Sequence, residues 1–532
     1  MKLNVKFFVL FVYFVVDKYH NISIELKVQQ SRLQRISPGF AGGDMSEIHF
    51  VDTTLRDGSQ SLWALGMRTG AMLSIAEQMD RIGFESMEFF VSAMYKKFVR
   101  EHKENPWDWM RLGAKRFSKT RIRYHGGLHG GFEKIPRCVL QLMIERVVSF
   151  GITLTRTSNS WNDFSAFKEE ELDGLNKLGM DAIANLIYSV SPRHTDDYYA
   201  RKAREAAAIR PYRICFKDVG GLLTPERART LISIILANIG DVPLEFHAHC
   251  NSGLAPLCYM EAIKLGVKTL HTAIPPLANG SSQPSIYNVA MNARALGFTP
   301  VVNEKEIKPV EEHFTFIAKR EGLPIGKPLE YDHSKYLHQV PGGMISNLRH
   351  QLRLVGLEDK IEATLEEAGR VRAEFGYPIM VTPLSQYVGS QAAINVILGE
   401  RYKEVTDQVI QYALGLWGKE GALLMDPDVK DKILSRPRAK EWIGWEPPQP
   451  SLKEVRRKFG GSSVSDEDLV LRFFAGDDAV KELHAAGSPR EDLNARQPLV
   501  RLIDGLSKRK ECSRIYVRKP GFSLTLERKN NL

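Results

Sequence analysis

The chain has 532 residues, 73 of them basic and 63 acidic, and its formal net charge is +10 at pH 7. Hydrophobic residues make up 43% and charged residues 26%, so collagen-like, coiled-coil and wholly disordered classes are excluded. The positive charge lies mostly at the ends: residues 1–44 carry six basic and three acidic groups, and residues 508–532 carry eight and two. Because the body is nearly neutral, we expect no nucleic-acid partner.

Two features near the N-terminus bear on location. Phe7–Val16 is an unbroken apolar run, too short to span a bilayer and without a small-residue cleavage site close behind it. We interpret residues 1–44 as an upstream extension, with Met45 as a second possible start; an export signal is the alternative.

The five cysteines, with no Cys-x-x-Cys pair, indicate a reducing, cytoplasmic setting; they are Cys138, Cys215, Cys250, Cys258 and Cys512.

From Met45 onward, short β-rich runs alternate with amphipathic helical stretches. Eight such units within about 250 residues are typical of a (β/α)8 TIM barrel, and a doubly wound open sheet is the competing layout. The predicted strands are Ile48–Asp52, Ser86–Phe90, Arg121–His125, Ile152–Arg156, Ala182–Tyr188, Tyr212–Phe216, Leu244–His247 and Thr269–Thr272.

After about residue 300 the strand pattern stops. We predict a barrel domain over residues 45–304, a helical funnel-like domain over 305–450 with helices near Leu357–Phe375 and Leu384–Val396, and a C-terminal segment over 451–532. That last segment is predicted to hold two short helices over 451–485 and a basic tail. Pro520-Gly521 between two alternating runs predicts a hairpin in the tail.

Three polar clusters follow predicted strands, where barrel enzymes place their reactive groups. Asp57 follows the first strand, Lys217-Asp218 ends the sixth, and His247-Ala248-His249 ends the seventh. In a strand, His-x-His projects both rings to one side, and two imidazoles with one carboxylate are a common divalent-metal site. The alternative is that these histidines are merely packed at a strand end.

Seven segments in one order carry a family resemblance. DTTLRDGSQSL, KENPW, FKDVGGLLTPE, HAHCNSG, SSQPS, VPGGMISNL and VTPLSQYVG together resemble the carboxyltransferase domain of biotin-dependent enzymes, over about residues 48–480. That family includes pyruvate carboxylase, the oxaloacetate decarboxylase alpha subunit and transcarboxylase, within the wider HMG-CoA lyase-like barrels. The lyases and isopropylmalate-type synthases share the RDGxQ and HxH segments but lack the lysine at Lys217.

The resemblance implies a site. It implies that Asp57, an N-carbamylated Lys217, His247 and His249 hold Zn, Mn or Co, with Arg56 stabilising enolate charge. It also implies that Gln60 binds substrate and that Thr382 passes a proton between biotin and an enolate. Without the resemblance, we would interpret Lys217 as a surface or ion-paired lysine beside Asp218, and Thr382 as part of an ordinary turn or helix start.

The resemblance fails where the acceptor should bind. His125 stands where pyruvate-type members have a carboxylate-clamping arginine, Phe132 where they have tyrosine, and Lys96 where they have aspartate. His125, His129, Lys96 and Phe132 are therefore candidate substrate-binding residues of a rebuilt pocket. Cys250, at the position of an acid, is expected to be an inert small residue.

We therefore expect a carboxyltransferase subunit that moves CO2 between carboxybiotin and an enolisable, oxo-acid-like substrate other than standard pyruvate. The sequence holds no Met-Lys-Met biotinylation site and no ATP-grasp domain, so the expected partners are biotin carboxylase and biotin carrier subunits, with homo-oligomer formation. The alternatives are a biotin-free lyase, decarboxylase or aldolase on the same scaffold, and a non-catalytic scaffold subunit.

Overall fold

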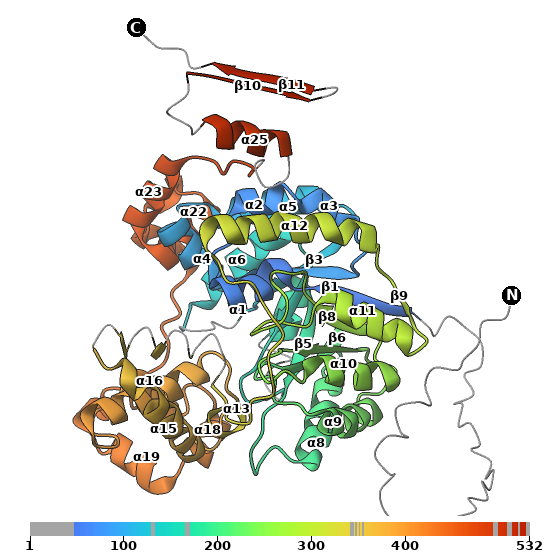
Figure 1. The fold of residues 1–532 in the computed structure, drawn as a ribbon. Coiled ribbons are helices and arrows are strands. Elements are labelled where there is room, and N and C mark those ends of the chain that lie inside the picture. The colour runs from blue at the N-terminus through green and yellow to red at the C-terminus, as the bar shows by residue number, and fades with distance from the viewer. Residues whose placement is uncertain are drawn as a thin grey trace, which may run out of the picture. The chain divides into compact units, whose positions relative to one another are not determined.

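The computed structural model describes residues 47–128, 134–164, 167, 171–340, 345, 348–349, 352–353, 356–492, 498–507, 513–519 and 522–527 (Figure 1). Within these residues, no helix is both long and apolar enough to cross a membrane. The N-terminal extension and the candidate residues His129 and Phe132 lie outside the described part of the chain.

Eight parallel strands close into a barrel. Each strand pairs with the next in sequence, and β1 pairs with both β2 and β8, so the TIM-barrel prediction is confirmed and the open sheet is excluded. A two-residue strand, β9 (Thr299–Pro300), lies beside β1. The barrel strands are β1 (Glu47–Asp52), β2 (Ser86–Val91), β3 (Arg121–His125), β4 (Leu154–Thr157), β5 (Asp181–Ile187), β6 (Arg213–Asp218), β7 (Leu244–Ala248) and β8 (Thr269–Thr272).

Helices connect the strands and surround them (Figure 1). The predicted N-cap at Thr224 is present: its hydroxyl accepts the N–H of Arg227 at 3.1 Å, and Pro225 takes the first helical position. The helices of this part are α1 (Ser59–Trp63), α2 (Thr69–Leu73), α3 (Ala76–Asp80), α4 (Met94–Lys97), α5 (Pro106–Arg116), α6 (Arg137–Ser149), α7 (Asp173–Lys177), α8 (Asp196–Ala208), α9 (Pro225–Asn238), α10 (Ala255–Lys264), α11 (Ile286–Ala295) and α12 (Glu304–Glu321), with π-turns at Thr54–Gly58 and Phe98–His102.

The following region is helical, as predicted. The two helices expected there are α15 (Ile361–Glu374) and α16 (Leu384–Leu398). The others are α13 (Lys335–His338), α17 (Asp407–Ala413), α18 (Lys419–Leu424), α19 (Pro427–Leu434) and α20 (Pro437–Lys440), with a 3-10 turn at Glu358–Lys360.

The C-terminal segment differs from the prediction in helix number. Three α-helices rather than two lie between residues 451 and 486, because Gly476 has a positive φ of 88° and separates α22 from α23. The predicted hairpin is confirmed, with Ile515 opposite Leu526. These elements are α21 (Leu452–Lys458), α22 (Asp466–Ala475), α23 (Asp477–Ala486), α25 (Pro498–Ser507), β10 (Arg514–Lys519) and β11 (Phe522–Glu527), with a 3-10 turn at Gly461–Ser463.

The apolar side chains form two main cores. One joins the barrel helices to α12 and to α22, for example through Phe314 and Leu469. The other joins α15, α16 and α17 and includes Trp161, which comes from the loop after β4 and stacks on Tyr412. The helical region is therefore anchored to the carboxyl end of the barrel, where the candidate site residues lie.

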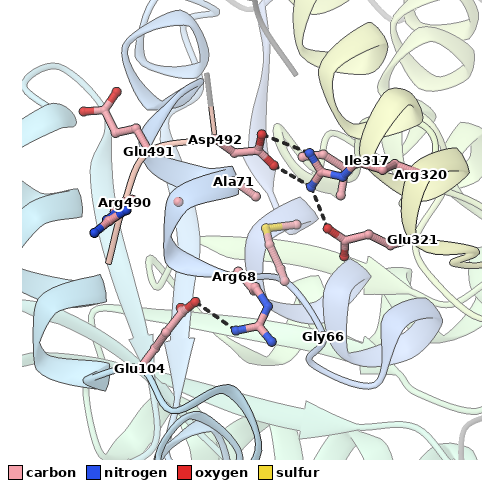
Figure 2. Close-up of a pocket in the computed structure, with 12 residues that line it drawn as sticks. Gly66, Arg68, Ala71, Glu104, Ile317, Arg320, Glu321, Arg490, Glu491 and Asp492 are labelled. Carbon is pink, nitrogen blue, oxygen red and sulfur yellow. Dashed lines mark hydrogen bonds and ion pairs between the residues drawn. The ribbon is translucent and has the colours of Figure 1, made fainter. Parts of the chain in front are cut away.

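A pocket of about 270 Å³ lies between α2, the end of α12 and the segment after α23 (Figure 2). Arg320 bonds Asp492 at 2.5 Å and Glu321 at 2.6 Å, and Arg68 bonds Glu104 at 3.2 Å. The pair between Arg320 and Asp492 ties the chain after α23 to α12. None of the predicted site residues lines the pocket.

Candidate metal centre

Three of the four predicted metal ligands meet at the carboxyl end of the barrel. Asp57 lies in the π-turn after β1, His247 near the end of β7, and His249 just beyond it. Each offers a ligand atom, and these atoms all lie within 4.8 Å of one another. The Asp57 Oδ2 atom is 3.2 Å from His247 Nε2 and 3.5 Å from His249 Nε2. The strand-end pattern thus brings a carboxylate and two imidazoles together.

A residue that was not predicted from sequence lies among these ligands. The side-chain nitrogen of Gln283 is 3.3 Å from Asp57 Oδ2, 3.2 Å from His247 Nε2 and 3.0 Å from His249 Nε2. An amide NH2 has two hydrogens, so it cannot donate a full hydrogen bond to all three atoms. Gln283 lies eleven residues beyond the end of β8, so the strand-end rule that selected the histidines does not reach it; its one sequence signal is the SSQPS segment of the family resemblance.

The position of the Gln283 nitrogen tests whether the site suits a metal. The ligand atoms of one carboxylate and two imidazoles converge on a single buried position, which the side-chain nitrogen of Gln283 occupies. This donor set and its convergence fit a divalent ion such as Zn, Mn or Co, provided that the amide moves aside.

Charges around Asp57 keep it ionised. Burial alone would raise its pKa, but the charge of Arg56, followed by the interactions with His249 and His247, outweighs burial and holds the pKa well below its usual range. For His247, burial and the charge of Arg156 lower the pKa well below its usual value, so the ring is neutral. A metal site needs these protonation states, an ionised carboxylate and an unprotonated imidazole.

Lys217 lies beside this cluster on β6. It is the register partner of His247 on β7 and is 7% exposed. Burial, followed by the charge of Arg156, lowers the pKa of Lys217 to about 7. A large share of the amine is therefore neutral near physiological pH and able to act as a nucleophile. The adjacent Asp218 is buried too, and burial raises its pKa to about 6.

Arg56 is held inside the barrel mouth by two carboxylates. Its guanidinium is 3.1 Å from Asp57 Oδ2 and pairs with Glu88 of β2. Glu88 also pairs with Arg156 of β4, and all of these side chains are at most 4% exposed. The two buried arginines thus place positive charge beside Asp57 at the mouth of the barrel.

The structure places the other candidates around this mouth. Gln60 is exposed in α1 and accepts from Arg56 at 3.4 Å. Lys96 lies half-buried in α4, after β2. Thr382 is exposed, and its carbonyl accepts from the hydroxyl of Ser160, in the loop after β4, at 3.2 Å.

His125 ends β3, beside Arg156 in the register of β4. Its Nδ1 atom is buried and has no hydrogen-bond partner among the residues that the structure describes. Burial, together with the charges of Arg56 and Arg156, lowers the pKa of His125 well below its usual value. A neutral imidazole cannot replace an arginine that binds a substrate carboxylate by charge. Its unsatisfied nitrogen can still make a hydrogen bond with a ligand.

Cys250 follows His249 and is 3% exposed. Burial raises the pKa of its thiol, which is therefore protonated near neutral pH. A buried, protonated thiol is a poor nucleophile, as expected for an inert small residue.

Comparison with known proteins identifies the family of the chain. A pyruvate carboxylase subunit of Methanocaldococcus jannaschii is 33% identical over 456 residues, which cover 84% of this chain and 80% of that protein. The chain belongs to the carboxyltransferase family of biotin-dependent carboxylases. The 2-oxoglutarate carboxylase large subunit of Hydrogenobacter thermophilus is also 33% identical, over 74% of this carboxyltransferase and 60% of that protein.

The family models and a solved structure agree with this assignment. A conserved carboxylase domain matches residues 336–493, and an HMGL-like domain matches residues 172–313. The carboxyl transferase domain of Rhizobium etli pyruvate carboxylase superimposes with a TM-score of 0.74 at 21% identity, covering 91% of this chain and 84% of that one. The carboxyltransferase therefore shares the fold of that domain.

Proposed function

We propose that this carboxyltransferase moves CO2 between carboxybiotin, carried on a separate protein, and a 2-oxo acid other than pyruvate. The observation that carries the proposal is the convergence of Asp57, His247 and His249 on one buried position beside Lys217. In the forward reaction, the bond between biotin nitrogen and CO2 breaks and a carbon–carbon bond forms at the enolised carbon. The proton lost from that carbon ends on the biotin nitrogen.

We assign the metal to four residues: Asp57, His247, His249 and Lys217 as its carbamate. The neutral amine of Lys217 is suited to react with CO2, which would turn a cationic side chain into an anionic oxygen ligand. A divalent ion bound there would supply a Lewis acid that polarises the substrate carbonyl. Arg56 supplies fixed positive charge beside the same position.

Thr382 is our candidate for the proton relay. A hydroxyl can both donate and accept, as a relay between an enol oxygen and the biotin nitrogen requires. Its contact with Ser160 supports this role, because the loop after β4 belongs to the barrel face that carries the candidate ligands.

The acceptor proposal depends on the residues around His125. A neutral histidine at the end of β3 does not form the charged pair that an arginine makes with a small oxo acid. We therefore infer an acceptor that is bound differently from pyruvate, with Gln60, Lys96 and His125 as candidate contacts and His129 and Phe132 as further candidates from sequence. The relative that carboxylates 2-oxoglutarate makes a longer oxo acid a reasonable first choice.

The same proposal names the partners. Biotin carboxylase and biotin carrier subunits would load CO2 and deliver it, in keeping with the Methanocaldococcus relative, which is one subunit of a pyruvate carboxylase. The expected homo-oligomer and cytoplasmic location stay predictions.

The test uses the half-reaction that needs no partner. The purified full chain is incubated with free biotin and the β-carboxylated form of either pyruvate or 2-oxoglutarate, and the release of each oxo acid is followed. Release that requires biotin, disappears with a chelator and returns with Zn, Mn or Co supports the proposal. Metal-dependent release that is the same without biotin would instead establish the lyase or decarboxylase alternative.

A further inference from the structure

Beneath the candidate metal centre, a line of buried side chains leads away from His247. The His247 Nδ1 atom is 3.1 Å from His271 Nδ1 on β8, and His271 Nε2 is 3.0 Å from Glu245 Oε1 on β7. All three residues are 0% exposed. They use the His247 nitrogen that faces away from Asp57, so the line is separate from the predicted ligand atoms.

The protonation of these rings follows from their neighbours. The carboxylate of Asp57 accepts only, so the Gln283 amide must point its NH2 group at Asp57 and at both imidazole Nε2 atoms. Thr53 and Ser282 hold the other end of the amide, its oxygen, at 2.7 and 3.3 Å. A donor faces both Nε2 atoms, but the carboxylate acceptor Asp57 Oδ2 also lies 3.2 Å from His247 Nε2 and 3.5 Å from His249 Nε2. The partner of Nδ1 therefore decides whether the ring proton is on that atom.

For His249, that proton has an acceptor in the backbone. Its Nδ1 lies 2.7 Å from the carbonyl oxygen of Ser281, which can only accept. For His247, the only acceptor at Nδ1 among the described residues is His271 Nδ1. The Glu245 carboxylate can only accept, so His271 carries its proton on Nε2 and donates it there, which leaves Nδ1 of the neutral ring as the acceptor for His247 Nδ1–H.

The far end of the line is fixed by charge. Arg123 Nη1 bonds both oxygens of Glu245, at 2.9 and 3.0 Å, and keeps the carboxylate in place as an acceptor. Glu88 lies 3.7 Å from His271 Nδ1, beyond hydrogen-bond distance, and is paired with Arg56 and Arg156. His271 thus has one acceptor on one side and one donor on the other.

We propose that His271 and Glu245 are positioning residues that fix His247 in the tautomer with its proton on Nδ1, so that Nε2 is free to bind a metal. This inference rests on the proposed function, which makes His247 a ligand. The partners of a metal-bound histidine orient its ring and set its basicity, and their loss typically costs about 10- to 100-fold in metal affinity.

Two substitutions at one position separate this role from simple packing. His271→Gln keeps an acceptor for His247 and a donor for Glu245, because an amide carries both groups on one end. His271→Leu fills similar space but offers neither. Affinity for Co²⁺ is measured by competition with a chromophoric chelator on the metal-free full chain, and the visible absorption of bound Co²⁺ reports its ligand field.

The proposal expects an affinity about 10- to 100-fold weaker for His271→Leu, with an altered Co²⁺ spectrum, and an affinity for His271→Gln within about threefold of wild type. Equal affinity in all three proteins overturns the inference. A second Co²⁺ in wild type that is lost from both variants also overturns it, since His271 would then be a ligand. A wild-type chain that binds no divalent ion refutes the proposed function instead.

A measurement on wild type covers the case in which His271→Leu does not fold. In ¹⁵N-histidine-labelled, metal-free protein, ring-nitrogen shifts distinguish the two neutral tautomers, and the His247 signals are assigned by comparison with His247→Gln. The proposal expects the proton of His247 on Nδ1 and that of His271 on Nε2. The opposite tautomer at His247 overturns it.

Discussion

Lys217 of β6 and His247 of β7 are register partners on adjacent strands, so the amine and the imidazole lie at the same level of the barrel. Burial lowers the pKa of Lys217 to about 7, and an amine must be unprotonated to react with CO2. The carbamate assigned above therefore makes metal binding depend on dissolved CO2.

We expect bicarbonate to raise the Co²⁺ affinity of wild type and to leave that of Lys217→Ala and Lys217→Arg unchanged. Arginine keeps the charge but forms no carbamate. The bicarbonate effect should grow as pH rises through about 7, because the neutral fraction of Lys217 grows over that range. Competition with a chelator in CO2-free and in bicarbonate buffer measures the Co²⁺ affinity. A wild-type affinity that does not change with bicarbonate would contradict the carbamate.

The side-chain nitrogen of Gln283 lies at the candidate metal position, between Asp57, His247 and His249. Gln283→Glu would place a second carboxylate beside Asp57, and the repulsion between the two charges would be relieved when a cation binds. We expect this variant to bind Zn²⁺ about tenfold more tightly, which corresponds to about 1.4 kcal/mol. Calorimetric titration measures it, with Gln283→Asn as a neutral control; weaker binding by the glutamate variant would count against a cation at this point.

Asp80 anchors the chain just before β3. Its carboxylate accepts the backbone N–H groups of Ser118, Lys119 and Thr120 at 2.8–3.1 Å. Burial alone would raise the pKa of Asp80, but these hydrogen bonds outweigh it and lower the pKa. Asp80→Asn should reduce the free energy of unfolding by about 1–3 kcal/mol at neutral pH.

The sign of the pH dependence follows from that lowered pKa. The contribution of Asp80 to the free energy of unfolding is fully present above the pKa that Asp80 has in the unfolded chain. It is lost as the pH falls through the pKa of Asp80 in the folded protein. The difference between wild type and Asp80→Asn in denaturant unfolding should therefore shrink in acid. Asp478→Asn, whose side chain is 94% exposed, is the matched control and should change stability by less than about 0.5 kcal/mol.

Trp161 links the loop after β4 to the second apolar core. It stacks on Tyr412 with ring centroids 6.2 Å apart and is 3% exposed. Trp161→Ala should destabilise the region of α15–α17 by about 3–5 kcal/mol and speed its proteolysis. Unfolding followed by circular dichroism measures the loss, and the half-buried Trp445→Ala serves as the comparison; equal effects of the two changes would argue against the anchoring role.

The sequence by itself determined the barrel and indicated most of the residues at its candidate metal centre. Alternation of β-rich and amphipathic segments predicted all eight strands, with Arg121–His125 and Thr269–Thr272 matching β3 and β8 at both ends. Polar residues at strand ends identified Asp57, His247 and His249, because period-two alternation and the position of strand ends are local properties that a sequence records directly.

Only the tertiary structure decided which other residues contact the side chains at those strand ends. Gln283 and His271 are far from Asp57 in sequence, and closure of the barrel brings β8 beside both β1 and β7. Likewise, the low pKa of Lys217 depends on burial and on Arg156 across the barrel, neither of which a local pattern contains. The local spacing of residues specifies which side chains face the site. Long-range packing specifies the neighbours of those side chains, and the neighbours set their protonation states.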